Sequence, residues 1–208
     1  GLILIVSMNL ESITTRPATP TPDDGLLFAE FANDIARGAF ARLFGREYGR
    51  ILARAFVEPH HEMSYQTTTF AELEGVAVGM VSAYVPGPHA PPPWDQLRLE
   101  PGGRLRRGLA VAMLRSVKRG FTNHDEDSYY VHFLDVAAHY RGNGIGTYLM
   151  RVAESRAREA GVARFRLDVE GSNTGARRLY ERLGLRVVSR YPRLALIPPI
   201  VLGMMKEL

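Results

Sequence analysis

The chain has 208 residues, of which 46% are hydrophobic, and its formal net charge is +4. This composition is enough to fill the core of one domain and excludes an intrinsically disordered chain. No cysteine is present. That absence excludes disulfides, a thiolate nucleophile and cysteine metal sites, so a cofactor must supply the thiol for any thioester chemistry. Nothing points to secretion, and we expect a cytoplasmic protein.

Arginine supplies almost all of the basic charge, because only Lys118 and Lys206 among the 26 basic residues are lysine. The densest basic cluster, within residues 104–119, flanks the apolar run 109–114. This pattern is typical of an amphipathic helix with a solvated basic rim. It also lacks the interleaved aromatic residues that would favour a polyanion site. We therefore predict no nucleic-acid partner.

The N-terminal residues 1–6 are apolar, but they are too few to span a bilayer and lack the basic region of a signal peptide. We predict no membrane segment. Residues 1–11 are interpreted as an N-terminal extension or an expression remnant, and residues 12–208 as a single domain.

The first half of the domain alternates short strands with helices. We expect a helix that Asp23 or Asp24 caps, and a hairpin that turns at Glu74 and Gly75. The proline-rich residues 86–101 cannot form a regular element and predict a surface loop beside an acceptor site. The elements expected up to residue 119 are strand 12–16, helix 23–37, helix 48–57, strands 65–73 and 76–85, and helix 108–119.

The second half continues with strand 129–136, a helix from Gly144 to Gly161, and strand 165–169. A strand, a helix and a strand in this order predict a parallel crossover. Ser172 or Asn173 caps the next helix, which ends at Gly184, and strands 186–190 and 201–206 close the chain. We predict a mixed α/β (α+β) fold whose central mixed β-sheet carries helices on both faces.

A glycine-rich loop, residues 141–147, joins the first of these strands to its helix. Alternate glycines let ligand oxygens approach the backbone N–H groups, and the helix N-terminus adds its positive dipole end. No Gly-Lys-[Ser/Thr] sequence closes the loop, and the dinucleotide spacing fails at Thr147, so the two common nucleotide motifs are excluded. The loop is Arg141, Gly142, Asn143, Gly144, Ile145, Gly146 and Thr147. It predicts a phosphate cradle.

Two segments, LDVAAHYRGNGIGTYLM (134–150) and LDVEGSNTGARRLYERLG (167–184), resemble the GCN5-related N-acetyltransferase (GNAT) superfamily. The resemblance covers residues 130–184 and rests on two motifs in matching order and spacing. It departs from the family pattern at Ala138, Asn143 and Leu185. It implies the GNAT acyltransferase fold and acetyl-coenzyme A as the cofactor, with the pyrophosphate of the cofactor at the glycine loop.

The resemblance also implies the residues that contact the cofactor. A backbone N–H of the strand that carries Val136 is the family's usual donor to the developing oxyanion. The implied cofactor-binding set is Asp135, Val136, Ala137, the seven residues of the glycine loop, Asn173 and Tyr180. Alternation along the strand turns Asp135 away from Leu134 and Val136, which favours a structural role for its side chain.

Two side chains are the candidates for acid and base. The resemblance assigns Tyr180 as the acid that protonates the departing thiolate, and its spacing from Asn173 places both on one helix face. His132 is the candidate base, because we expect it to share a strand face with Leu134 and Val136 and its pKa is near neutral. A half-buried tyrosine, a simple cap at Asn173 and a packed histidine are the structural alternatives.

Other acidic and histidine residues are weaker candidates. Glu72 or Glu74 could act as the base through a water molecule. The run His60, His61 and Glu62 suggests a metal site, but adjacent side chains diverge and no partner cluster follows, so we predict a loop and no metal.

The sequence thus predicts an enzyme that transfers an acetyl group to a primary amine by direct attack in a ternary complex. The amine is a small metabolite, an amino-acid derivative, or a peptide N-terminus or lysine. A non-catalytic acyl-coenzyme A sensor and a basic nucleic-acid-associated module are the alternatives, and a homodimer stays open.

Overall fold

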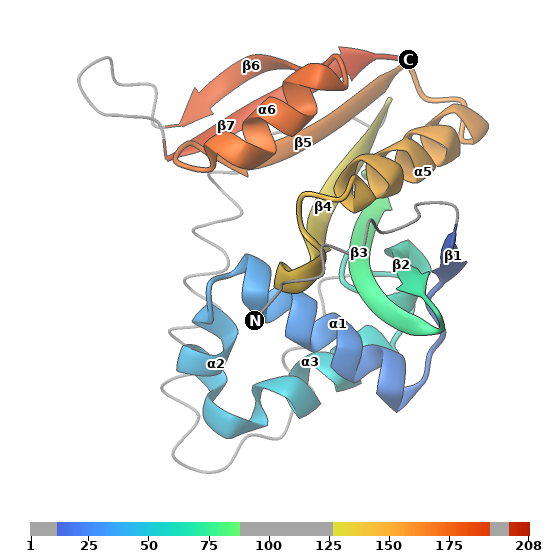
Figure 1. Cartoon of the computed structure of the whole chain (residues 1–208), viewed down its shortest axis with the longest axis vertical. Helices are drawn as coiled ribbons and strands as arrows, with labels where there is room; N and C mark the ends of the chain where they lie inside the picture. Colours follow the sequence, from blue (N-terminus) through green and yellow to red (C-terminus); the bar gives the residue numbers. More distant parts are fainter. Residues whose placement is uncertain (1–11, 88–126, 192–199) are drawn as a thin grey trace, which may run out of the picture.

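The computed structural model describes residues 12–87, 127–191 and 200–208. These residues form one seven-stranded sheet in the order β1-β2-β3-β4-β5-β7-β6, with helices packed on it (Figure 1). Two predicted segments lie outside the described residues: the surface loop 86–101 after Gly87, and the helix 108–119.

The helices and strands follow the predicted order. The strands are β1 (Ile13–Pro17), β2 (Thr68–Leu73), β3 (Val76–Tyr84), β4 (Ser128–Val136), β5 (Arg164–Glu170), β6 (Arg186–Tyr191) and β7 (Val201–Glu207). The helices are α1 (Pro22–Ile35), α2 (Ala39–Phe44), α3 (Tyr48–Phe56), α5 (Ile145–Glu159) and α6 (Thr174–Arg182), with short 3-10 turns at Gly45–Glu47, Tyr65–Thr67 and Ala138–Tyr140.

The sheet is mixed, as predicted. The neighbouring pairs within β1 to β4 are antiparallel, and so are the pairs β5–β7 and β7–β6. The pair β4 and β5 is parallel and is joined through α5, which confirms the predicted crossover. Every described strand except β1 and β6, which form the edges, has a neighbour on both sides.

Each face of the sheet carries its own apolar core. On one face α5 and α6 pack through Leu149, Ala153 and Tyr180 against sheet residues such as Val81 and Phe165. On the other face α1 and α3 pack against Phe70 and Met80 of β2 and β3. The rings of Phe28 and Phe56 stack there with centroids 4.7 Å apart. Helices therefore cover both faces, which confirms the predicted fold class.

Helix α1 begins earlier than predicted. Thr21, rather than an aspartate, is the N-cap, and its side chain accepts a hydrogen bond from the backbone N–H of Asp24 at 3.3 Å. Pro22 occupies the first turn, where its missing N–H costs nothing. The carboxylate of Asp24 is thereby left to contact another element.

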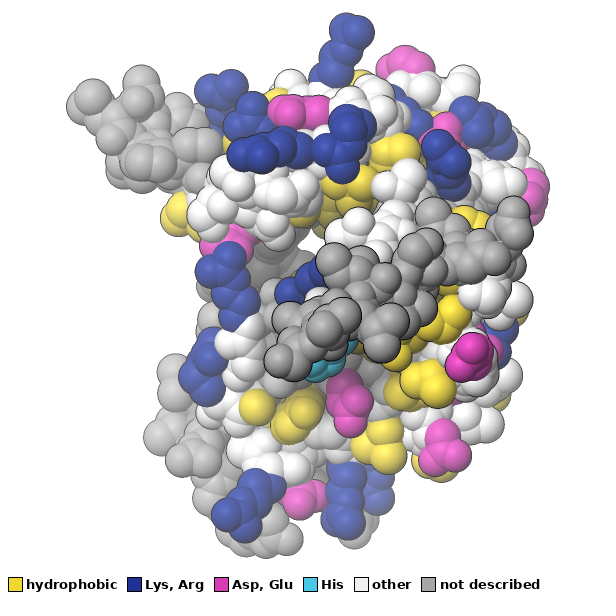
Figure 2. Space-filling model, viewed as in Figure 1, with side chains coloured by type: hydrophobic (Ala, Val, Ile, Leu, Met, Phe, Trp, Pro, Cys, Tyr) yellow, Lys and Arg dark blue, Asp and Glu magenta, His cyan; other side chains and the backbone are white. Residues whose placement is uncertain are grey.

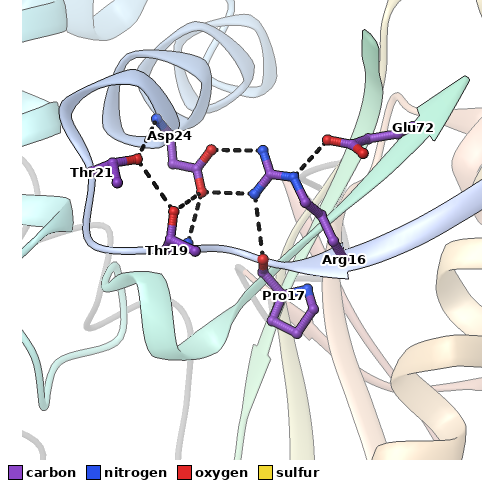
Figure 3. A network of polar contacts seen from close by, with 6 residues as sticks. All are labelled: Arg16, Pro17, Thr19, Thr21, Asp24 and Glu72. Atoms are coloured by element: carbon purple, nitrogen blue, oxygen red, sulfur yellow. Dashed lines mark hydrogen bonds and ion pairs between the residues drawn. The ribbon is translucent and has the colours of Figure 1, made fainter. Parts of the chain in front are cut away.

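That contact is an ion pair between α1 and β1 (Figure 3). Both oxygens of Asp24 accept hydrogen bonds from the Arg16 guanidinium, at 2.7 and 2.8 Å. The same guanidinium donates to Glu72 of β2 at 2.6 Å, and Thr19 donates to Asp24 from its backbone and its hydroxyl. The network joins the first helix to the two strands at one edge of the sheet.

Helix α2 was not predicted. Its six residues lie between Gly38 and Gly45, which both have positive φ. A helix of this length is too short to show an apolar periodicity in the sequence.

Among the described residues, no helix combines the length and the apolar character needed to cross a membrane.

Candidate active site

The parallel strands β4 and β5 separate along their length. They pair from Ser128 with Arg164 to Val131 with Leu167, and the register ends there although both strands continue. Figure 1 shows the two strands close together at one end and apart at the other. The space-filling view shows an indentation between the part of the molecule built on α6 and the part built on α1 and α2 (Figure 2). The centre of the sheet is thus split where the motif residues lie.

The glycine loop lies at the carboxyl end of β4 and leads into α5. Gly142 and Gly144 have φ values of 81° and 85°, which side chains rarely adopt, and Gly144 is the N-cap of α5. A Cβ added to Gly142 would meet nothing within 4 Å. One added to Gly146 would lie 3.4 Å from Leu179 of α6 and 3.9 Å from Val136 of β4. The loop therefore has open space at its tip and brings β4, α5 and α6 together.

Arg141 links the loop to β4. Its Nε donates to the carbonyl oxygen of Val136 at 2.7 Å, and its Nη2 contacts Oδ1 of Asp135 at 3.1 Å. The side chain is 56% exposed. Asn143 stabilises the same turn, because its side-chain amide donates to the backbone oxygens of Tyr140 and Arg141 at 3.2 Å.

Asp135 lies mostly buried beneath this arginine. Its Oδ2 has no hydrogen-bond partner among the described residues. Burial raises the pKa of the carboxyl group, and the backbone of Val136 and the charge of Arg141 oppose that rise only in part. The carboxyl group also acts on Tyr180, whose pKa it raises.

Asn173 and Tyr180, which the sequence predicts to share one helix face, belong to α6 and its N-cap. Asn173 is the N-cap, and its Oδ1 accepts a hydrogen bond from the backbone N–H of Ala176 at 3.1 Å. Tyr180 is 7% exposed and belongs to the core between α5, α6 and the sheet. Burial and, second, the nearby charge of Asp135 raise the pKa of Tyr180 to about 12. The phenol is therefore protonated at neutral pH.

The predicted orientation of His132 is wrong. Leu134 and Val136 pack on the α5 side of the sheet, whereas the ring of His132 stacks on Phe133, which belongs to the core under α1. A β-bulge explains the difference, because β3 pairs with Val131 and then with Phe133, and His132 is the extra residue. An extra residue shifts the alternation by one, so residues before and after it exchange faces.

On that face His132 lies among residues that we did not predict. Its ring centroid is 6.2 Å from those of Tyr84 and Tyr130. The Tyr130 hydroxyl donates to Asp168 of β5 at 3.1 Å, and the Tyr84 hydroxyl to Glu62 at 3.4 Å. Asp168 lies between the apolar residues Leu167 and Val169, so strand alternation could have placed its side chain on the opposite face. No sequence pattern marks the bulge at His132.

The other candidates take structural positions. Glu72 is bound to Arg16, and Glu74 lies in the β2–β3 turn with a φ of 52°. His61 is buried and contacts the backbone of Ala55 and Met63. Within residues 12–87, 127–191 and 200–208, no group of three or more metal-ligating side chains occurs.

A sequence model described as the acetyltransferase (GNAT) family matches residues 29–185. The search among curated proteins found no match. The matched region contains the glycine loop, the diverging strands and Tyr180.

Solved structures share the fold. An N-acetyltransferase from Staphylococcus aureus Mu50 is 16% identical, with a TM-score of 0.63 over 93% of this chain and 100% of its own. SsHAT is 22% identical, with a TM-score of 0.61 over 94% of this chain and 98% of its own. The NatC complex bound to Gag peptide and CoA is 15% identical, with a TM-score of 0.53 over 95% and 99%. At these identities the similarity establishes the fold.

Proposed function

Because the chain belongs to the GNAT acetyltransferase family, we propose that it transfers the acetyl group of acetyl-coenzyme A to a primary amine by direct attack. One observation supports this proposal above the others. The separated ends of β4 and β5 lie next to a glycine loop at a helix N-terminus and a buried, protonated tyrosine.

The residues present suit the cofactor. Gly142 and Gly144 are exposed and have positive φ, and the space beside Gly142 is open. The first turn of α5 adds N–H groups without partners in the helix, together with the positive dipole end, which favour pyrophosphate. Arg141, which contacts Asp135, would add its positive charge next to the pyrophosphate. Bound acetyl-coenzyme A supplies the thioester that the amine attacks.

The chain's own groups then have distinct tasks. Attack requires a neutral amine, and His132, at the start of the split between β4 and β5, is the candidate to accept its proton. A backbone N–H of β4 at Val136 stabilises charge that develops on the acetyl oxygen. Tyr180 donates its phenolic proton to the departing sulfur. Holding amine and thioester together contributes several kcal/mol, about 7–11 in well-oriented cases.

The test compares two substitutions that add the same charge to α5. Gly146→Glu places a carboxylate between β4 and α6, where the loop would meet the pyrophosphate, and Ser155→Glu places one on the exposed side of the helix. Calorimetric titration of acetyl-coenzyme A should show that Gly146→Glu loses at least a hundredfold in affinity, whereas Ser155→Glu retains it. Equal affinities would contradict the assignment of the loop.

A thiol-release assay over a panel of amines, on the same preparation, tests the reaction. Release with one class of amine would establish the transferase. Binding without release from any amine would replace the enzyme with an acyl-coenzyme A sensor.

A further inference from the structure

A cluster of aromatic and acidic side chains lies on the α1 side of the sheet, beyond the apolar core under that helix. We call it the polar–aromatic cluster, and it consists of Glu62, Tyr84, Tyr130, His132 and Asp168. The ring centroids of Tyr84 and Tyr130 are 5.8 Å apart in an edge-to-face arrangement. Apart from Tyr130, whose exposure is 5%, its members are only half-buried.

The cluster lies at the point where β4 and β5 separate. Val131 and Leu167 form the last pair of the parallel register. The next residue of β4 is His132 and the next residue of β5 is Asp168, so these two side chains flank the start of the split. The β-bulge at His132 turns its ring toward Tyr84 and Tyr130 rather than toward α5.

The chemistry of the cluster favours a cation. Each tyrosine hydroxyl donates to one carboxylate, Tyr84 to Glu62 and Tyr130 to Asp168. Aromatic faces and carboxylates both attract an ammonium group. Burial raises the pKa of Asp168, while the Tyr130 hydroxyl and the charge of Arg166 counteract the rise. Among the described residues, Arg166 is the cation whose charge acts on Asp168.

A carboxylate on the ligand would instead be repelled by the carboxylates of Glu62 and Asp168. Like charges repel at these distances, and partial burial weakens solvent screening. A free α-amino acid carries its carboxylate two bonds from the amine and would bring it to Glu62 or Asp168. An amide or a peptide bond at that position carries no charge.

We propose that the polar–aromatic cluster is the acceptor subsite and selects cationic amines that carry no neighbouring carboxylate, such as amino-acid amides and peptide N-termini, over free amino acids. This inference rests on the proposed function, because it takes the split between β4 and β5 as the place where the thioester is presented.

The test compares leucine amide with leucine as acceptors. The ratio of their kcat/KM values is measured for the unmodified protein and for Glu62→Gln with Asp168→Asn, so that the different intrinsic reactivities of the two amines cancel. We expect the double substitution to lower the amide-to-acid ratio about tenfold, the factor that corresponds to roughly 1.4 kcal/mol. Glu30→Gln, on the exposed side of α1, is the matched control and should leave the ratio unchanged.

An unchanged ratio in the double variant, with acetyl-coenzyme A affinity retained, would overturn the subsite. Glu62→Gln alone, at a half-buried position in the connection before β2, keeps the test decisive if the double variant does not fold, and a ratio about threefold lower is expected. If the unmodified protein releases thiol with no amine of the panel, the proposed function fails. Calorimetry then measures the binding of leucine amide and of leucine to the coenzyme A-saturated protein. The ratio of their affinities, compared between the unmodified protein and the variants, decides the subsite.

Discussion

Tyr180 is buried in the core between α5, α6 and the sheet, and the charge of Asp135 on β4 acts on its phenol. A general acid typically contributes a hundredfold or more to the rate, and phenylalanine keeps the packing while it removes the proton. We expect Tyr180→Phe to lower kcat about a hundredfold, with little change in acetyl-coenzyme A affinity. Steady-state kinetics with calorimetry would measure both.

Tyr148→Phe is the control for that substitution. Tyr148 is half-buried on α5 and packs against the same core, but it has no assigned role in the reaction. Equal losses in the two variants would indicate a packing effect, and an unchanged kcat in Tyr180→Phe would remove the assigned acid.

His61 makes stability depend on pH. Its Nδ1 accepts from the backbone N–H of Met63 at 3.2 Å, so its Nε2 carries the proton donated to the Ala55 carbonyl at 2.8 Å. Burial lowers the pKa of His61, although the contact with Ala55 opposes that shift. A pKa below the unfolded value means that the stabilising contribution is complete above about pH 6.5 and is lost as the pH falls below it.

Denaturant unfolding between pH 7.5 and 5.5 would test this dependence. The free energy of unfolding should fall with pH, and His61→Asn should have a lower stability that varies less over this range. His60→Asn, at the exposed neighbouring residue, should retain the original slope. The same slope in His61→Asn would show that other groups cause the effect.

At the scale of elements, the ion pair of Arg16 and Asp24 fixes α1 on the sheet (Figure 3). Burial alone would raise the pKa of Asp24, but hydrogen bonds from Arg16 and Thr19 outweigh it and hold the pKa below its usual range. Its contribution to stability is therefore present above about pH 3.9 and is lost as the pH falls below that value.

Substitution of the carboxylate tests this contact. Asp24→Asn should destabilise the protein by about 1–3 kcal/mol, because charge-assisted hydrogen bonds are lost at a buried site. Asp23→Asn, at the exposed neighbouring position, should change the free energy of unfolding by less than about 0.5 kcal/mol. Chemical denaturation at pH 7 would compare the two, and equal effects would contradict the role of the ion pair.

At the scale of the whole molecule, we expect the proposed cofactor to contact β4, α5 and α6 together, so its binding should stabilise the folded chain as a unit. At a hundred times its Kd, a ligand adds about 2.7 kcal/mol. For a chain of this length that corresponds to a rise in Tm of about 5–10 °C. Thermal unfolding with and without acetyl-coenzyme A would measure the rise.

Duplex DNA at the same concentration should leave the Tm unchanged, because the basic charge is distributed over the chain. A rise with DNA that disappears at high salt would favour the nucleic-acid-associated alternative instead.

The sequence by itself determined the elements around the site. The strand before residue 137, the glycine loop, the Asn173 cap and the stop at Gly184 are encoded by side chains within a few positions of one another. Local periodicity and turn chemistry act over such short ranges, so a single sequence reveals them. The crossover between β4 and β5 followed from these elements.

The tertiary structure decided which side chains meet. The bulge at His132 depends on the register that β3 imposes on β4, and the contact of Tyr130 with Asp168 joins two residues that lie 38 positions apart in the sequence. Arg16 meets Asp24 and Glu72 only because β1 pairs with β2 beside α1. Such contacts depend on the packing of distant segments, where one inserted residue in a strand reverses the faces of the residues that follow.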